Sequence, residues 1–348
     1  MAEHTLLLSG YGAPGCDDLA VCRLESDGTL CTLFTARHGR APSFCCQGEN
    51  GWIYVASERQ DGADITAYAL EDGGFREITC LEIPGGQALC HLYPLGNVIY
   101  GSCFGNGLFF AVSGDLSRIL WKFQPRGANA HWAQAVGQTL FLADLGNHCL
   151  YRFPLQDNLP VGDAVILPQP VGSGPRQVLN TGENTIACVY ELDGSLRVLD
   201  DAGRILSAVQ ASRDIDHQNW PGGACIAENG VLFVCNRGPN TISAWRGNGT
   251  QYSALQEWPT GDWPRHLCAV PGTATLLAAC QREGAVHCYD VSGLPQPPTE
   301  TARIDLPGAS CVLVLKPNSD KGIRQRPALC KSRASCPVVV IGFLNSAF

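Results

Sequence analysis

One strand–turn–strand phrase occurs seven times in this chain at nearly constant spacing, and no other feature constrains the fold as strongly. The phrases begin at His4, Gly51, Asn97, Gln138, Asn184, Gly230 and Ala274, at intervals of 47, 46, 41, 46, 46 and 44 residues. Each joins an apolar, β-rich run to a second alternating run through a polar turn that contains Gly or Asn. This is the pattern of a β-hairpin.

Further short runs lie on either side of these phrases. Runs that precede a phrase cover residues 42–47, 88–93, 131–136, 175–180, 223–227 and 264–270. A fourth run, such as residues 76–83, follows most phrases. Four strands in each period of about 45 residues are typical of a β-propeller blade. The sequence therefore predicts an all-β, seven-bladed β-propeller with four-stranded blades, and no long helical periodicity competes with it.

The two ends of the repeat complement each other. No innermost strand precedes the first phrase, and the run 310–315 follows the seventh phrase without outer strands of its own. We expect 310–315 to supply the innermost strand of the first blade, so that the ring closes without open edges. The propeller then spans residues 1–315. Residues 316–348 form a C-terminal extension outside the period, which we expect to be poorly ordered.

Composition narrows the function classes. A net charge of −8 disfavours nucleic-acid binding and a role at a membrane surface. The 18 cysteines form no CxxC pair and no Cys/His cluster at zinc spacing, so we expect no metal and no cofactor. The first residues resemble no signal peptide, which predicts a cytoplasmic protein with reduced thiols that pack as small hydrophobes.

Aligning the blades predicts a site. The innermost strand of a blade runs antiparallel to the second, so the start of one and the end of the other meet on one face of the ring. Polar residues at these two positions are His91, His131, Arg176, Arg265, Glu58, Asp144, Glu191, Asn236, Arg237 and Gln281. They favour a pocket for an anionic, oxygen-rich small molecule, because arginine suits phosphate and carboxylate. Each residue alone is also compatible with a structural role, and Arg176 and Glu191 could simply pair with each other.

Four short motifs suggest a family. They are FLADLG at 141–146, GPRQ at 174–177 followed by CVYEL at 188–192, FVCNRG at 233–238, and GDWPRH at 261–266. In this order they resemble the lactonase family of seven-bladed propellers, which includes bacterial 6-phosphogluconolactonases and fungal carboxymuconate-lactonizing enzymes. The resemblance implies that His131, Arg176, Glu191 and Arg265 are the catalytic residues.

The chain departs from the family pattern at several motif positions. Asn129 stands where a histidine is usual, Gln177 replaces the histidine of the GPRH phrase, and Tyr190 replaces the asparagine of the NEL phrase. Ala224 or Cys225 stands where a further histidine is usual. These departures leave the substrate open, and they allow reduced activity.

Three functions are compatible with these observations. The first is metal-independent hydrolysis of a sugar-acid lactone, with 6-phosphogluconolactone of the pentose phosphate pathway favoured by the resemblance. His131 would then be the general base, the two arginines would bind the anion and the oxyanion, and Glu191 would orient them or shuttle a proton. The second is a lactonizing or cycloisomerising reaction on a carboxylated substrate such as carboxymuconate. The third is a non-enzymatic, protein-binding propeller, although the phrases lack the residue pairs of WD40 repeats.

Overall fold

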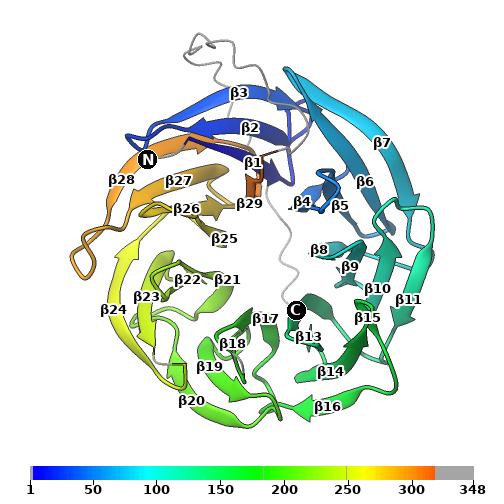
Figure 1. The fold of residues 1–348 in the computed structure, drawn as a ribbon. Helices are drawn as coiled ribbons and strands as arrows, with labels where there is room; N and C mark the ends of the chain where they lie inside the picture. Colours follow the sequence, from blue (N-terminus) through cyan, green and yellow to red (C-terminus); the bar gives the residue numbers. More distant parts are fainter. Residues whose placement is uncertain (1–2, 183, 248, 318–348) are drawn as a thin grey trace.

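The computed structural model describes residues 3–182, 184–247 and 249–317. In this part of the chain the strands form seven antiparallel sheets arranged as blades around a common centre (Figure 1). Six of these sheets have four strands and one has five. The seven-bladed β-propeller predicted from the repeat is therefore confirmed. The predicted C-terminal extension lies outside the described residues from position 318 onwards.

We number the blades in chain order and give their strands from the centre outwards. Blade 1 contains β29 (Ala309–Leu315), β1 (His4–Gly10), β2 (Leu19–Leu24) and β3 (Leu30–Ala36). Blade 2 contains β4 (Pro42–Gln47), β5 (Ile53–Arg59), β6 (Gly62–Glu71) and β7 (Gly74–Glu82). Blade 3 contains β8 (Leu89–Leu95), β9 (Val98–Cys103), β10 (Leu108–Ser113) and β11 (Ile119–Phe123).

Blade 4 has an additional short strand at its outer edge. It contains β12 (Ala130–Val136), β13 (Thr139–Asp144), β14 (Cys149–Gln156), β15 (Leu159–Pro160) and β16 (Val165–Pro168). Blade 5 contains β17 (Pro175–Asn180), β18 (Thr185–Tyr190), β19 (Ser195–Asp200) and β20 (Ile205–Gln210). Blade 6 contains β21 (Trp220–Ile226), β22 (Val231–Arg237), β23 (Thr241–Gly247) and β24 (Tyr252–Pro259). Blade 7 contains β25 (Pro264–Ala269), β26 (Thr275–Cys280), β27 (Ala285–Asp290) and β28 (Thr299–Asp305).

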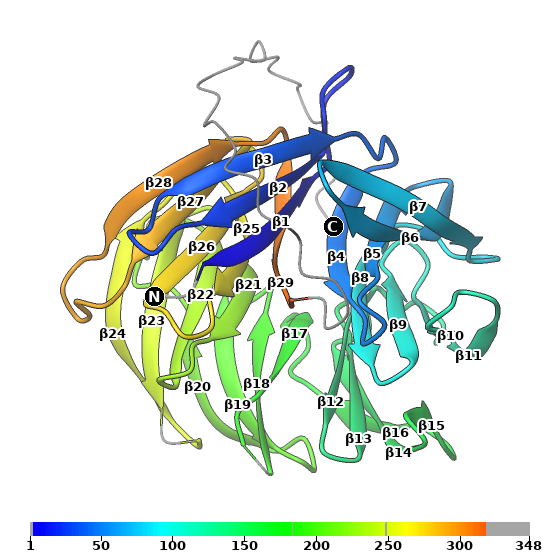
Figure 2. The ribbon, with the colours of Figure 1, turned by 45° about the horizontal axis from the view of Figure 1, so that its top comes forward.

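The ring is closed by a strand from the other end of the repeat. Strand β29 pairs antiparallel with β1, with Thr5 opposite Leu315 and Ser9 opposite Cys311. The orange strand β29 accordingly lies beside the dark blue strand β1 in both views (Figures 1 and 2). Within blade 1, this pairing gives β1 a partner on each side. The predicted closure by residues 310–315 is thus confirmed, one residue longer than expected.

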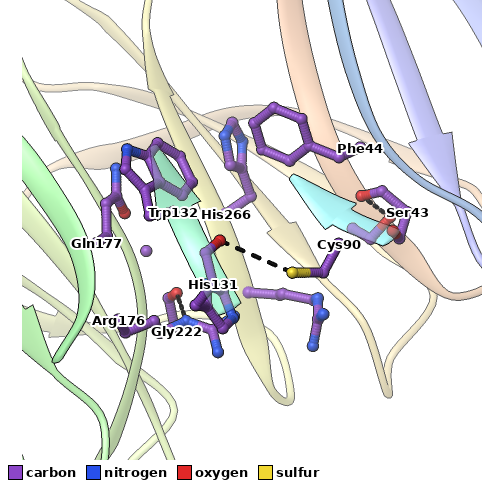
Figure 3. Close-up of a pocket in the computed structure, with 12 residues that line it drawn as sticks. Ser43, Phe44, Cys90, His131, Trp132, Arg176, Gln177, Gly222 and His266 are labelled. Atoms are coloured by element: carbon purple, nitrogen blue, oxygen red, sulfur yellow. Dashed lines mark hydrogen bonds between the residues drawn. The ribbon is translucent and has the colours of Figure 1, made fainter. Parts of the chain in front are cut away.

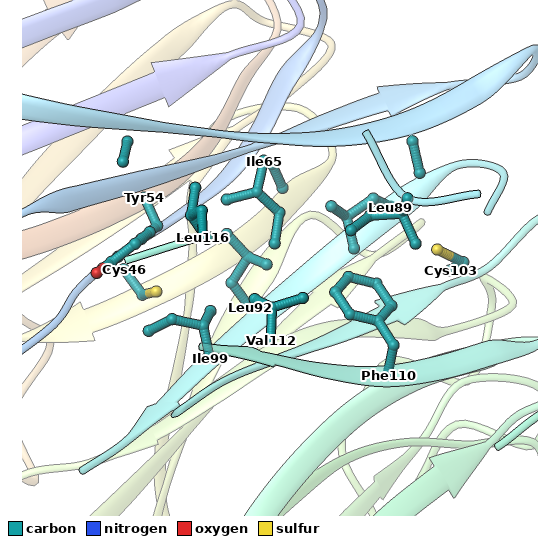
Figure 4. Packing of buried hydrophobic residues seen from close by; sticks show 14 of the residues in the cluster. Cys46, Tyr54, Ile65, Leu89, Leu92, Ile99, Cys103, Phe110, Val112 and Leu116 are labelled. Atoms are coloured by element: carbon teal, nitrogen blue, oxygen red, sulfur yellow. The ribbon is translucent and has the colours of Figure 1, made fainter. Parts of the chain in front are cut away.

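Apolar side chains fill the space between neighbouring blades. One cluster joins blades 2 and 3, with Tyr54 and Ile65 on one side and Leu92 and Phe110 on the other (Figure 4). Gly101 makes room for this contact, because a Cβ there would lie 2.1 Å from Cζ of Phe110. Burying one such large side chain contributes about 1.5–3 kcal/mol, so the interfaces between blades supply much of the stability.

The buried thiols belong to the same packing. Cys46 and Cys103 are part of the cluster between blades 2 and 3, and Cys235 and Cys280 are fully buried in the cluster between blades 6 and 7. These cysteines pack as small hydrophobic side chains, as the strand pattern predicted. In the described ranges no helix is long and apolar enough to cross a membrane.

The closing strand can be tested by truncation. A chain that ends at residue 308 lacks β29, which leaves the edge of β1 and the apolar contacts of Val312 and Leu315 without partners. The loss of a whole innermost strand should exceed the ~5–15 kcal/mol that stabilises a domain, so this chain should not fold cooperatively. A chain that ends at residue 317 is the control. Equal thermal unfolding midpoints for both chains, measured by circular dichroism, would contradict the proposed role of β29.

Candidate active site

Every innermost strand carries a β-bulge close to its start. The register with the second strand shifts there in all seven blades, so that an additional residue stands on the inner strand. The additional residues are Ser43, Cys90, His131, Arg176, the pair Gly222 and Gly223, Arg265, and Ser310. A bulge bends the strand and redirects a side chain. The fold therefore presents one residue per blade at the same place near the centre.

The backbone before several bulges has an unusual conformation. Gly174 and Gly308 have φ angles of +61° and +67°, and Ala41, Ala88 and Trp263 have φ angles of +51°, +52° and +61°. A left-handed conformation costs an alanine or a tryptophan roughly 1–2 kcal/mol relative to its preferred regions. These five residues immediately precede inner strands. The chain accepts this local strain where it turns towards the centre.

The bulged residues line one pocket. Figure 3 shows it with Cys90, His131, Arg176 and Gly222 around the opening. Its walls consist of Ser43, Phe44, Cys90, His131, Trp132, Arg176, Gln177, Gly222, Gly223, Arg265, His266 and Ser310. All seven blades contribute, so the pocket lies where the inner strands converge. The glycines of blade 6 are required by close packing, because a Cβ on Gly222 would lie 2.5 Å from the carbonyl oxygen of Pro264.

Two arginines share one glutamate on one side of the pocket. Glu191 accepts a hydrogen bond from Nη1 of Arg176, and its Oε2 lies 2.9 Å from Nη2 of Arg237. Arg176 also donates from Nε to the carbonyl oxygen of Gly222, and Arg237 donates from Nε to that of Trp220 at 2.7 Å. Burial by itself raises the pKa of Glu191, but Arg237 and Arg176 outweigh it and lower this pKa to about 2. Glu191 therefore stays ionised and holds both guanidinium groups in place.

A second acid–arginine pair comes from blades 1, 2 and 7. Nη2 of Arg265 lies 3.5 Å from Oε2 of Glu58, and the hydroxyl of Tyr11 donates to the same oxygen at 2.6 Å. The guanidinium of Arg265 also lies 5.2 Å from the centre of the Tyr11 ring. Although burial lowers the pKa of Arg265, Tyr11 and Glu58 raise it above its usual range. Arg265 is thus permanently charged, and its Nη2 atom is held by Glu58.

His131 stands between these two groups with a free ring nitrogen. Its side chain is 5% exposed, and its Nδ1 has no hydrogen-bond partner among the described residues. Burial, followed by the charges of Arg176 and Arg265, holds the pKa of His131 well below its usual value. The imidazole is therefore neutral near pH 7. A neutral imidazole keeps a lone pair on one ring nitrogen, and this nitrogen can accept a proton.

Two other predicted binding residues, His91 and Asp144, are held by contacts with neighbouring protein groups. His91 lies one residue beyond the bulge, stacks on Trp132 with a centroid distance of 3.6 Å, and accepts a hydrogen bond from the Ala133 backbone. Asp144 is fully buried and accepts hydrogen bonds from the backbone N–H groups of Asn129 and Asn147. Neither side chain lines the pocket.

Two further predicted residues lie behind the pocket wall. The side chain of Asn236 is fully buried and bonds to Asn219, Thr241 and Ser243. Gln281 has a buried side-chain oxygen without a partner among the described residues, and its backbone N–H donates to Trp263. Of the predicted residues, His131, Arg176 and Arg265 line the pocket. Glu191 with Arg237, and Glu58, are joined to these arginines by ion pairs. The residues His91, Asp144, Asn236 and Gln281 neither line the pocket nor belong to these pairs.

Several lining residues were not identified from sequence. Cys90 takes the place of His91, because the bulge moves the lining position by one residue. Burial raises the pKa of the Cys90 thiol, which donates weakly to the Ser102 carbonyl oxygen. His266 was overlooked although it follows Arg265 directly. Burial and then Arg265 lower the pKa of His266 to about 4. Aligning the second residue of every inner strand would have found Ser43, Cys90 and Ser310.

The seven converging bulges and two acid–arginine groups define a propeller with a candidate small-molecule site at the centre of its ring. A family model described as a lactonase, seven-bladed β-propeller, matches residues 5–314 of the chain. The chain therefore belongs to the lactonase family of seven-bladed propellers, which is named for lactonases, and these are hydrolytic enzymes.

Individual relatives agree with this family. A 6-phosphogluconolactonase of Formosa agariphila is 26% identical over 162 residues, which cover 41% of this chain and 44% of that protein. The match thus spans less than half of this relative. The structure of a candidate 6-phosphogluconolactonase from Bacteroides fragilis superposes with a TM-score of 0.81 at 18% identity, covering 90% and 98% of the two chains. A periplasmic gluconolactonase from Pseudomonas aeruginosa gives 0.80 at 19% identity, covering 90% and 99%. At these identities the structural likeness concerns the fold.

The paired state of Glu191 predicts how stability depends on pH. Its pKa of about 2 lies below the 4.5 of a free glutamate, so its stabilisation is complete above about pH 4.5 and is lost as the pH falls towards 2. The loss should be on the order of 3 kcal/mol. Urea unfolding of the wild type and of Glu191→Gln between these pH values would measure it. The variant should be less stable near pH 7 and should lose less stability on acidification, whereas parallel curves would contradict the assignment.

Proposed function

We propose that the protein hydrolyses a sugar-acid lactone at the central pocket, without a metal ion. The observation that carries this proposal is that a neutral His131 lines the same pocket as Arg176 and Arg265, each of which is paired with a glutamate. A lactone needs a base to activate water and a cation to stabilise the oxyanion. Its hydrolysis product is a carboxylate, for which guanidinium groups are suited.

The charge around the pocket supports an anionic substrate. Three arginines, Arg176, Arg237 and Arg265, accompany two glutamates, Glu58 and Glu191. With a neutral His131 this leaves one positive charge. Arg265 binds Glu58 through Nη2 only, so that Nε and Nη1 have no acceptor among the described residues. Both nitrogens carry N–H groups that can donate to a phosphate or a carboxylate.

The proposed reaction uses water as the nucleophile. His131 accepts a proton from water through a ring nitrogen, and the oxygen attacks the lactone carbonyl carbon. The carbonyl oxygen becomes an oxyanion, which Arg176 or Arg265 stabilises. The ring C–O bond then breaks, and the alkoxide takes the proton back from His131. The product is an open-chain hydroxy acid. Glu191 acts as a positioning residue for Arg176 and Arg237, because its carboxylate is already bound by both.

Within this class we favour 6-phosphogluconolactone as substrate, which would place the enzyme in the pentose phosphate pathway. The names of the Formosa and Bacteroides relatives support this choice. The surplus positive charge also suits a phosphorylated lactone.

One departure from the family pattern concerns Gln177, whose amide bonds to the Ala224 N–H and C=O at 2.8 Å each. The Gln177 side chain therefore links the innermost strands of blades 5 and 6. The residues beside Gln177 are left to contact the substrate.

A cytoplasmic location belongs to the same proposal. The buried cysteines, such as Cys45, Cys46 and Cys311, carry free thiols, which suit a reducing compartment. The Pseudomonas relative, by contrast, is a periplasmic protein.

Substitution of Arg265 tests the oxyanion and anion site. Arg265→Ala removes a charged donor from the pocket, so turnover of 6-phosphogluconolactone should fall about 100- to 1000-fold. Arg204→Ala is the matched control, because the Arg204 side chain is exposed and pairs with Asp200 in its own hairpin. Circular dichroism should show that both variants fold. Wild-type turnover by folded Arg265→Ala would refute the assignment.

The state of His131 makes a prediction about pH. Because its pKa lies well below 6.5, the base is already unprotonated at neutral pH. The wild-type kcat/KM should therefore be nearly constant between about pH 6 and pH 8, and an unperturbed histidine would give an inflection there. His131→Ala should lose at least about a hundredfold in kcat across this range. The rates should be the same with and without a chelator. A strong loss of wild-type activity on chelation would contradict metal independence.

The same preparations distinguish the alternative functions. Formation of a lactone from a carboxymuconate, without hydrolysis of sugar-acid lactones, would indicate a cycloisomerising enzyme on the same site. Absence of both activities in the wild type would leave a binding function and would contradict the proposal.

A further inference from the structure

A second group of chemically reactive side chains lies in the hairpin between β26 and β27. Cys280 ends β26, Glu283 lies in the turn, and His287 is on β27. One donor atom from each residue lies within 4.8 Å of the others. Cys280 and His287 are buried, and Glu283 is 22% exposed. None of the three lines the central pocket.

The histidine is oriented as a metal ligand would be. Its Nδ1 lies 3.1 Å from Oε1 of Glu300 on β28, and its Nε2 lies 3.1 Å from Oε2 of Glu283. A carboxylate on one ring nitrogen fixes the tautomer and directs the lone pair of the other nitrogen outwards. That lone pair faces a carboxylate oxygen, and two acceptors repel unless a cation stands between them. Either a proton or a metal ion has to fill this position.

The glutamate can contribute one oxygen and keep its other partner. Arg303 binds Oε1 of Glu283 at 2.6 Å, which leaves Oε2 directed towards His287. The third donor, Sγ of Cys280, has only weak contacts, such as the 3.7 Å approach to the hydroxyl of Thr260. A thiolate, an imidazole and one carboxylate oxygen are a ligand set suited to zinc.

Gly261 provides the space in which these donors meet. A Cβ at this position would lie 1.9 Å from Oε2 of Glu283 and 2.6 Å from Nε2 of His287. The loop between blades 6 and 7 therefore passes the cluster closely enough that any side chain would displace two of the three donors. The backbone N–H of Asp262 also donates to Oε2 of Glu283 at 3.2 Å.

We propose that Cys280, Glu283 and His287 bind one divalent transition-metal ion, of which Zn²⁺ is the expected one, with water or a protein group as fourth ligand. Binding replaces the thiol proton of Cys280 and the proton between His287 and Glu283 by the metal, so two protons are released for each ion bound. No oxidation or reduction is involved. The three ligands follow a C-x2-E-x3-H pattern within one hairpin, which differs from the CxxC pairs typical of structural zinc sites.

Two other roles for the cluster are less well supported. A Cys–His–Glu nucleophile would need a reactive thiolate, but burial raises the pKa of Cys280 to about 12. A protonated histidine between two carboxylates gives no role to the thiol of Cys280, whereas a metal ion would bind it.

The site would stabilise the junction that leads to the central pocket. Residues 260–263 connect β24 to β25, and Trp263 accepts a hydrogen bond from the backbone of Gln281 at 2.9 Å. Arg265 follows two residues later. A metal ion held by the hairpin would lie next to Gly261. It would therefore restrict the movement of the loop formed by residues 260–263. The inference does not depend on the reaction at the pocket.

Metal binding to the full chain tests the proposal. Protein freed of metal with a chelator would be titrated with ZnCl₂ by calorimetry, and with CoCl₂ by absorption spectroscopy. We expect one strong site per chain, release of two protons, and a thiolate-to-cobalt charge-transfer band in the near ultraviolet. Bound Zn²⁺ should also raise the thermal unfolding midpoint, because it binds only the folded state.

Variants separate this site from other thiols. Cys280→Ser should abolish the cobalt band, and His287→Gln should weaken zinc binding at least tenfold. Gly261→Ala should weaken binding as strongly although all three donors remain. Cys268→Ser, which removes a half-buried thiol from β25 instead, is the matched control and should keep the band. Absence of a band in the wild type, or an equal band in wild type and Cys280→Ser, would overturn the proposal. If Cys280→Ser does not fold, Glu283→Gln provides the same comparison through zinc affinity.

Discussion

The pairing of β29 with β1 is the interaction on which the rest of this structure depends. Seven sheets can converge on one centre only if the ring has no gap, and this pairing joins residues from the two ends of the repeat. In the closed ring every innermost strand lies between the innermost strands of the two neighbouring blades, and each interface between blades is buried. The pocket exists because all seven inner strands start at one place, so closure of the ring is also a condition for the site.

Electrostatics at the centre follow from the same geometry. Convergence buries guanidinium and carboxylate groups where they cannot be fully hydrated, and a buried charge is tolerated only if it is paired. Glu191 pairs with Arg176 and Arg237, and Glu58 pairs with Arg265. The pairs fix the arginines before any substrate arrives, which is the preorganisation that an oxyanion site requires. The same charges, together with burial, keep His131 neutral.

Much of the fold and part of the site could be predicted from sequence. The spacing of seven similar phrases gave the blades, and the unmatched run near residue 310 gave the closure. Aligned strand ends pointed to His131, Arg176, Glu191 and Arg265, which the structure brings together. His91, Asp144, Asn236 and Gln281 were selected by the same rule, and their side chains lie outside the pocket wall. Strand alternation cannot reveal a bulge, and a one-residue bulge decides whether Cys90 or His91 reaches the centre.

By itself, the sequence determined the architecture, because a repeat of about 45 residues with four apolar runs has few other ways to bury its apolar faces. It also determined which chemical groups stand near the ends of strands. Only the tertiary structure decided which of those groups meet. That outcome depends on bulges, on left-handed backbone positions such as Ala88 and Trp263, and on glycines such as Gly222 and Gly261. These are contacts between residues from different blades and loops, and their distances are set by packing rather than by local sequence.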